Sequence, residues 1–269
     1  MLSDNHSKAD HYGDAPNLEY LIKRNNDPDL KAMALMGSFA RGDAGEFSDI
    51  DILRFFEKED KDRNGAGSHD IDGRLVVVCD IAHAKVDGWF TDPQMATRIV
   101  AGLRDAKPLF DPEGYFAEIQ RRAVGFMWDE SLQKKADEYA SREMVGWAEE
   151  AHKGLEGLKT GDAGRLINAN AGLCWGLPAV MRVKRGILLS SDNTYFSEVM
   201  TALGENSEWS LLCRKALCID SPLSLKDQAR AWLRLYVSTA RMIEDAIRPE
   251  DRPVIEAAVS KIERMLSTS

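Results

Sequence analysis

The stretch LMGSFARGDAGEFSDIDIL, residues 35–53, decides the fold of the N-terminal part of the chain. Gly37 and Ser38 end an apolar run, and an alternation of acid and isoleucine begins at Asp49. Successive side chains of a strand point to opposite faces, so Asp49 and Asp51 project from one face while the isoleucines enter the core. The stretch therefore predicts two strands joined by a tight turn and a short helix, with paired carboxylates on the second strand.

The acid pair and the Gly-Ser turn together indicate a site for metal-bound phosphate. Two neighbouring carboxylates repel each other unless a cation lies between them. Mg²⁺ takes oxygen ligands, usually one or two carboxylates together with the phosphates of a substrate. A small Gly37-Ser38 turn lets phosphate approach backbone N–H groups where a helix starts. This combination of groups is typical of nucleotide chemistry.

The order of these features resembles the polymerase-β-type nucleotidyltransferase superfamily. The resemblance includes Arg41-Gly42 after the Gly-Ser pair and Ser48 before the first aspartate, as in the family's GSxARG…SDIDL form. The resemblance is tight over residues 35–53 and loose over the rest of the N-terminal part. The alternative that the residues leave open is a turn followed by an edge strand whose acids are solvated.

The resemblance implies a two-metal site that binds a nucleoside triphosphate, ATP or another NTP. Asp49 and Asp51 would hold two Mg²⁺ ions, while Gly37, Ser38 and the neighbouring N–H groups would hold phosphates. Arg41 lies one helical turn beyond Ser38 and could reach a phosphate as a planar donor.

Arg41 has a structural alternative, which is an ion pair on the surface with Asp43 or Glu46. A third metal-binding acid is expected on the next strand, in an apolar–acid–apolar context. Asp80 is the first candidate, because Cys79 and Ile81 flank it near the end of the strand RLVVVCDI, and Asp72, in a turn, is its competitor. The remaining alternatives are an acid of the C-terminal part or no third acid.

The expected fold class is α+β, with an N-terminal nucleotidyltransferase α/β domain containing a mixed sheet, followed by a C-terminal helical bundle. The expected boundaries are a loose tail over residues 1–16, a catalytic domain over 17–115 and a helical domain over 116–269. Residues 57–68 read as a loop because they are charged and contain glycine. Expected elements of the catalytic domain are a helix over 18–23, strands over 30–36, 50–56 and 74–81, and a short helix over 38–42.

After residue 116 the apolar residues recur with helical spacing, and Pro178 should bend or end one of the helices. Asn170 lies within an apolar stripe and is either a bonded structural amide or a contact to nucleotide or acceptor. The basic residues after Pro178 either reach the triphosphate or are solvated; they are Arg182, Lys184 and Arg185. Candidates for a general base, with surface acids as the alternative, are Glu143, Glu149 and Glu150. The tryptophans expected in the core are Trp128, Trp147 and Trp175.

Composition excludes several classes of protein. The formal net charge of −9 disfavours nucleic acid as a partner, since such partners call for a basic patch. No apolar run is long enough to span a membrane, and the polar N-terminus lacks the apolar core of a signal peptide, so a cytoplasmic location is expected. The four cysteines have neither zinc nor redox spacing.

A nucleotidyltransferase head followed by a long helical part resembles the antibiotic nucleotidyltransferases, which act on aminoglycosides or lincosamides. The resemblance implies transfer of AMP from ATP, or of another NMP, to a hydroxyl of a small molecule. Two alternatives stay open, a nucleotidyltransferase that modifies a partner protein and a nucleotide-binding module without catalysis.

Overall fold

The computed structural model describes residues 17–60 and 62–267, which form two compact units. The sheet unit comprises residues 17–88 and Ala101–Phe126, and the helical unit comprises Trp89–Val100 and the described residues from 127 onward. The expected boundary after residue 115 thus differs from the observed division, which keeps the helix at residues 115–124 with the sheet. The expected tail over residues 1–16 lies outside the described residues.

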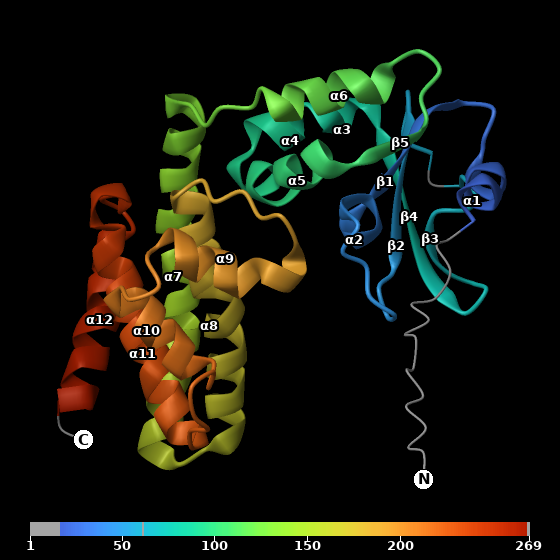
Figure 1. The fold of residues 1–269 in the computed structure, drawn as a ribbon. Coiled ribbons are helices and arrows are strands. Elements are labelled where there is room, and N and C mark those ends of the chain that lie inside the picture. Colours follow the sequence, from blue (N-terminus) through green and yellow to red (C-terminus); the bar gives the residue numbers. More distant parts are fainter. Residues whose placement is uncertain (1–16, 61, 268–269) are drawn as a thin grey trace, which may run out of the picture. The chain divides into compact units, whose positions relative to one another are not determined.

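The sheet unit is built on a five-stranded mixed sheet in the order β3-β4-β2-β1-β5 (Figure 1). The two central strands, β1 (Leu30–Met36) and β2 (Ile50–Phe56), are antiparallel, and β1 also pairs antiparallel with β5 (Lys107–Phe110). On the other side β2 runs parallel to β4 (Arg74–Ala82), which pairs antiparallel with β3 (Gly67–Ile71). The mixed sheet and the α+β class predicted from the sequence are therefore confirmed.

The helices of the sheet unit begin with α1 (Leu18–Asn25) and the five-residue α2 (Gly37–Arg41), which directly follows β1. After β4 comes the short α3 (His83–Val86). The next two helices, α4 (Gly88–Thr91) and α5 (Pro93–Asp105), cross the division between the units, because Trp89–Val100 belong to the helical unit and Ala101–Asp105 to the sheet unit. The last helix of the unit is α6 (Tyr115–Val124).

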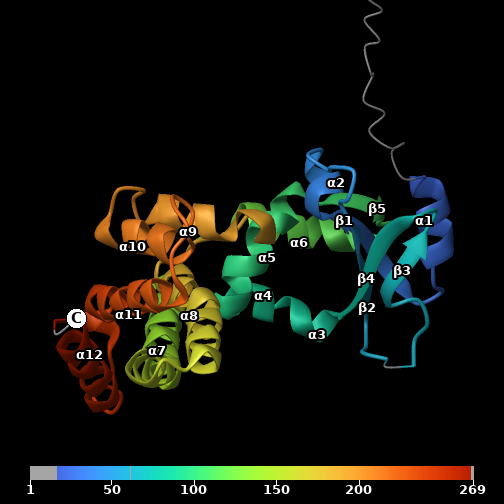
Figure 2. The same cartoon turned by 90° about the horizontal axis from the view of Figure 1, so that it is seen from below.

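Different helices cover the two faces of the sheet. Helix α1 lies against one face (Figure 2). Its Leu21 packs in a cluster with the inward side chains of β1, β2 and β4, among them Ile50 and Ile52. On the other face, Phe55 lies against Phe116 of α6, with ring centroids 5.6 Å apart. Asp51 and Phe55 are four residues apart on β2, so they share this second face, and α6 covers its Phe55 end.

Strand β3 was missed by the sequence interpretation, which placed a loop over residues 57–68 and a turn immediately after. The strand consists of Gly-Ser-His-Asp-Ile and is mostly exposed, so it carries neither β-branched enrichment nor a buried alternation. It exists because the Asp72-Gly73 turn folds the chain back, with positive φ at both residues, and pairs Ile71 with Arg74.

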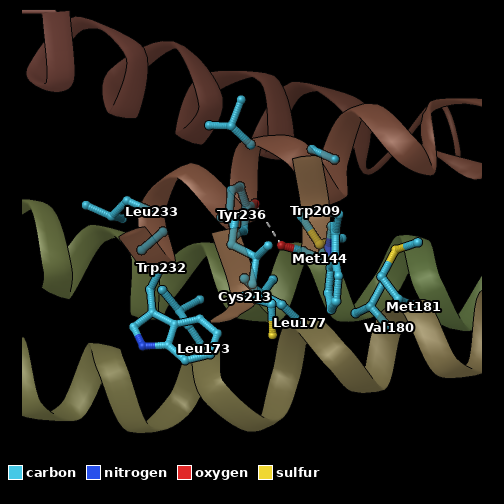
Figure 3. Packing of buried hydrophobic residues seen from close by; sticks show 14 of the residues in the cluster. Met144, Leu173, Leu177, Val180, Met181, Trp209, Cys213, Trp232, Leu233 and Tyr236 are labelled. Carbon is cyan, nitrogen blue, oxygen red and sulfur yellow. Dashed lines mark hydrogen bonds between the residues drawn. The ribbon is translucent and has the colours of Figure 1, made fainter. Parts of the chain in front are cut away.

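The helical unit consists of long helices around one apolar core, with a smaller set of buried residues beside it. Figure 3 shows how Met144, Leu173, Trp209 and Tyr236 meet in this core, where the Tyr236 hydroxyl donates to the Met144 carbonyl at 2.9 Å. Its helices are α7 (Glu130–Thr160), α8 (Ala163–Lys184), α9 (Tyr195–Ala202), α10 (Glu208–Ala216), α11 (Leu225–Met242) and α12 (Arg252–Ser267), with short 3₁₀ turns η1 (Asp192–Thr194) and η2 (Glu244–Ala246).

Pro178 does not end its helix, because α8 continues to Lys184. Proline has no N–H to donate and its ring crowds the preceding turn, which leaves carbonyls of that turn in need of other partners. The Tyr195 hydroxyl donates to the carbonyl of Trp175, within this turn, at 3.3 Å. This bond joins the start of α9 to the proline turn of α8.

No helix within the described part of the chain has both the length and the apolar character needed to cross a membrane.

Candidate functional site

The structure brings the Gly-Ser turn and the acid pair together at one end of the two central strands. Met36, the last residue of β1, pairs with Asp51 of β2, so Gly37 follows next to the acid. Gly37 has φ +67°, and a Cβ atom added there would lie 2.5 Å from Oδ2 of Asp51. The position therefore requires glycine both for its backbone conformation and for the space that the carboxylate occupies.

Two further groups at this end of the sheet have no internal partner. Asp49 lies one residue before β2 and makes no hydrogen bond or ion pair with any described residue, and the same holds for the hydroxyl of Ser38. Both side chains are half-buried, and Met36, the residue before α2, offers no side-chain cap to the first turn. The turn thus presents a carboxylate, a hydroxyl and uncapped backbone N–H groups.

The loop between α2 and β2 is held by local hydrogen bonds. Gly42 adopts a left-handed conformation and donates its N–H to the Ser38 carbonyl at 2.8 Å, which ends α2. The Ser48 hydroxyl accepts the N–H of Gly45 at 2.9 Å, just before the acid pair begins. Between them, Phe47 is 94% exposed, which is unusual for a large apolar side chain.

Arg41 pairs with Asp43, its Nε lying 3.3 Å from Oδ2 of the acid. This is one of the two ion pairs proposed as the structural alternative for Arg41. Asp43 is exposed, and an ion pair in contact with water does not prevent Arg41 from also binding a phosphate.

Asp80 is not brought together with the acid pair. In the parallel ladder between β2 and β4, Asp80 pairs with Arg54, three residues after Asp51, so Asp80 points to the opposite face of the sheet. There it binds Arg54 through two hydrogen bonds, from Nε to Oδ1 at 2.7 Å and from Nη2 to Oδ2 at 3.0 Å. Asp80 therefore does not lie beside Asp51, where a third metal-binding acid was expected.

The position that faces the acid pair from β4 is occupied by thiol and alkyl groups. Val77 pairs with Asp51, and Cys79 pairs with Leu53 on the same face. Crowding by neighbouring protein atoms and then the charges of Asp51 and Asp80 raise the pKa of the Cys79 thiol above its usual range. The side chain of Cys79 is nevertheless exposed at the surface of the sheet.

The competing acid, Asp72, lies at the tip of the β3–β4 hairpin, where it is exposed and has φ 54°. It follows that neither candidate from the sequence stands beside the acid pair. Across the residues that the structure describes, no three or more Asp, Glu, His or Cys side chains are grouped so that they could hold one metal ion.

The residues present fit a single magnesium-bound phosphate group. Two carboxylates, an unengaged hydroxyl and a glycine without room for a Cβ form the oxygen-rich, closely approachable set that Mg²⁺ with phosphate needs. For two ions the sheet unit supplies one acid fewer than expected.

The helical unit resolves several of the other candidates. The Asn170 amide nitrogen donates to Oε1 of Gln228 on α11 at 3.2 Å, while its Oδ1 atom is buried without a hydrogen-bond partner among the described residues. Glu149 and Glu150 both pair with Lys153, at 3.0 Å and 2.6 Å. Glu143 is half-buried, and burial raises the pKa of its carboxyl.

The basic residues after Pro178 differ from one another. Lys184 is buried and binds Asp137 at 2.9 Å and Asp245 at 3.0 Å, so the expectation of a solvated charge is wrong for it. Arg182 is also buried, whereas Arg185 is exposed.

The expected core tryptophans also differ. Trp128 and Trp147 are partly buried and pack against the two clusters, but Trp175 is 61% exposed. The expectation of a core position is therefore wrong for Trp175.

A surface groove of about 450 Å³ lies between α7 and α12 of the helical unit. Three basic residues line the groove, Lys159, Lys261 and Arg264, together with a single acid, Glu156. This groove lacks the acidic character that would favour a cationic acceptor.

One family model matches the N-terminal part of the chain. Residues 18–94 match the model of a family described as nucleotidyltransferase domain. Among solved structures, the chain is similar to a nucleotidyltransferase-like protein from Exiguobacterium sibiricum 255-15, with 12% sequence identity, a TM-score of 0.45, and coverage of 89% of this chain and 73% of that chain. No curated protein sequence matches the chain.

Proposed function

We propose, on the premise that residues 18–94 form a nucleotidyltransferase domain, that the protein transfers a nucleoside monophosphate, AMP from ATP or another NMP, to a hydroxyl of a small molecule. The observation that carries this proposal is the contact of the Gly37 turn with the Asp51 carboxylate. This contact supports phosphate binding by the turn and metal binding by Asp51, because one phosphate group could reach both.

Each residue has a distinct part in the proposed reaction. Asp49 and Asp51 hold Mg²⁺, which when bound neutralises charge on the triphosphate and lowers the pKa of an acceptor hydroxyl. The Ser38 hydroxyl and the N–H groups of the Gly37 turn donate hydrogen bonds to phosphate oxygens, and Arg41 adds a planar donor. Together these groups fix the triphosphate so that its α-phosphorus faces the acceptor in line.

The proposed acceptor is a hydroxyl-bearing small molecule, with aminoglycosides and lincosamides as the first compounds to test. An acidic protein attracts cationic molecules such as aminoglycosides, and the net charge of −9 has the required sign. Because the groove between α7 and α12 is basic, uncharged and anionic acceptors belong in the same panel.

Label transfer from α-³²P-labelled nucleotides to the panel, with Mg²⁺, tests the proposal. Asp51→Asn should abolish transfer, while Asp72→Asn, which removes an exposed acid from the neighbouring hairpin, should leave it unchanged. Transfer that persists in Asp51→Asn would show that the acid pair does not serve the reaction. Label found on protein instead of a small molecule would favour the modification of a partner protein.

A second candidate function, nucleotide binding without transfer, is favoured by the side chains around Asp51. Cys79 and Val77 occupy the face of β4 where a third acid would be expected. Under this alternative, calorimetry would find Mg-nucleotide binding while no acceptor became labelled. Cys79→Asp would add the missing carboxylate, and transfer appearing only in this variant would identify the natural protein as a binding module.

A further inference from the structure

Arg182 of α8 is a buried arginine without a counter-ion. Arg182 is 7% exposed, and its Nε atom is buried without a hydrogen-bond partner. The guanidinium forms no ion pair or hydrogen bond with any residue in the described ranges. Lys184, two residues later on the same helix, has two carboxylate partners, so the unit does pair its other buried cation.

The groups around Arg182 do not supply a negative charge. The ring of Tyr195 lies beside the guanidinium, with 5.7 Å between its centroid and Cζ. Burial raises the pKa of Tyr195, and it raises the pKa of the nearby Tyr139 to about 12, so both phenols stay neutral. Asp192 is an acid within electrostatic reach, but it is exposed and lies 3.8 Å from Arg98.

Deprotonation cannot remove the cost of burying this charge, because arginine stays protonated under all ordinary conditions. Burial of a charge without a partner is strongly unfavourable, and buried charges in proteins are therefore paired or bind a ligand. Burial lowers the pKa of Arg182, which agrees with a cation held away from water. A missing anion is the simplest account of this environment.

We propose that Arg182 is the anchor of a ligand site in the helical unit, which takes a small molecule through a phosphate or carboxylate group. The planar donor fork of arginine matches the two oxygens of either group. The rings of Tyr195 and Trp175 are stacked at 5.8 Å with 21° between their planes, and Trp175 is exposed. The exposed Trp175 ring, supported by the buried Tyr195, offers an apolar surface for the body of the ligand next to its charged group. The site is defined within the helical unit and does not depend on the proposed transfer reaction.

Thermal unfolding of the full chain with two probe anions tests the site. Inorganic pyrophosphate stands for a phosphate ligand and benzoate for a carboxylate ligand, each at constant ionic strength with EDTA, so that metal-dependent binding in the sheet unit does not contribute. At about a hundred times its Kd, an anion that binds the folded protein should raise the melting temperature by roughly 5–10 °C. The anion that produces the larger rise identifies the ligand class.

Arg182→Met and Arg185→Met form a matched pair, because both remove one positive charge from the end of α8 and only Arg182 is buried. Arg182→Met should lose the response to the anion, and Arg185→Met should keep it. Without anion, Arg182→Met should melt at or above the wild-type temperature, since it removes an unpaired buried charge. Arg182→Lys, which keeps the charge but lacks the fork, should show a weakened response to the anion.

Three results would overturn the proposal. They are an equal response to anion in wild type and Arg182→Met, no response of the wild type to either anion, and a marked loss of stability in anion-free Arg182→Met. The last result would make Arg182 a structural residue that packs on Tyr195.

Discussion

Asp80 and Arg54 form a two-point ion pair on the core side of the sheet, with N–O distances of 2.7 Å and 3.0 Å. Arg54 is 2% exposed and also donates to the backbone carbonyls of Asn25 and Asn64. The pair therefore ties together the end of α1, the loop before β3 and the two parallel strands. An acid expected to serve chemistry is engaged in holding the sheet unit together.

Asp80→Asn should therefore act on stability, with a loss of about 3 kcal/mol of unfolding free energy, because it leaves the buried guanidinium of Arg54 without a counter-charge. Chemical denaturation followed by circular dichroism measures this loss. Asp72→Asn, at an exposed hairpin tip, is the control and should stay close to wild type. A stable Asp80→Asn protein that loses nucleotide transfer would return Asp80 to the reaction.

The acid pair should destabilise the protein when no cation is present, because neighbouring carboxylates repel each other. Asp49→Asn and Asp51→Asn should each raise the melting temperature in EDTA and remove the further rise that Mg-ATP gives the wild type. Scanning calorimetry with and without Mg-ATP measures both effects. A full Mg-ATP response in both variants would place the metal elsewhere.

Ser38→Ala removes a hydroxyl that has no partner among the described residues, so the apo protein should keep its stability. If the hydroxyl donates to a charged phosphate oxygen, the loss in Mg-nucleotide binding should be roughly 1.5–3 kcal/mol. Isothermal titration calorimetry measures it. Unchanged affinity together with reduced stability would identify Ser38 as a residue that supports α2 and does not contact phosphate.

The reactivity of Cys79 should report the charge of Asp51. The pKa of this thiol is raised by its surroundings, including the carboxylate of Asp51, and the thiolate is the reactive form. Alkylation of Cys79 by iodoacetamide should therefore be slow at neutral pH and accelerate as the pH rises through the raised pKa. In Asp51→Asn the pKa should fall, so the peptide containing Cys79 should become labelled faster at the same pH.

Mass spectrometry of that peptide gives the rate, with Asp72→Asn as the control for a distant charge. Equal rates of alkylation in wild type and Asp51→Asn would contradict a shared face for Cys79 and Asp51.

The local part of this structure could be predicted from the sequence, and the non-local part could not. The observed bounds of β1 and β2 match the predictions because an apolar run and a two-residue alternation are properties of consecutive residues. The face to which Asp80 points depends on the register between β2 and β4, which no local pattern contains, and a shift of one residue reverses it.

The errors in the helical unit have a similar origin. Charged residues near a helix end usually face water, yet Arg182 and Lys184 are buried, because their helix packs on several sides. Trp175 was expected in the core for its apolar character, but its ring lies on the outer side of α8 against Tyr195 and Phe196. Helical spacing shows which residues share a stripe, and tertiary contacts decide how wide the buried stripe is.

The chain passes from the sheet unit to the helical unit after Gly88, returns after Val100 and leaves again after Phe126. The inserted piece is firmly held, since Thr97 is buried and its carbonyl accepts the N–H of Leu189 at 2.9 Å. Two domains that simply follow one another are connected by one crossing of the chain. Here the chain crosses three times, so the two units are interleaved in the sequence. The sheet unit expressed alone as residues 17–126 would include Trp89–Val100 without the helices on which this segment packs. The helical unit expressed from residue 127 would lack the same segment. Attempts to study either unit by itself should therefore begin from a circularly permuted or internally deleted gene instead of a simple truncation.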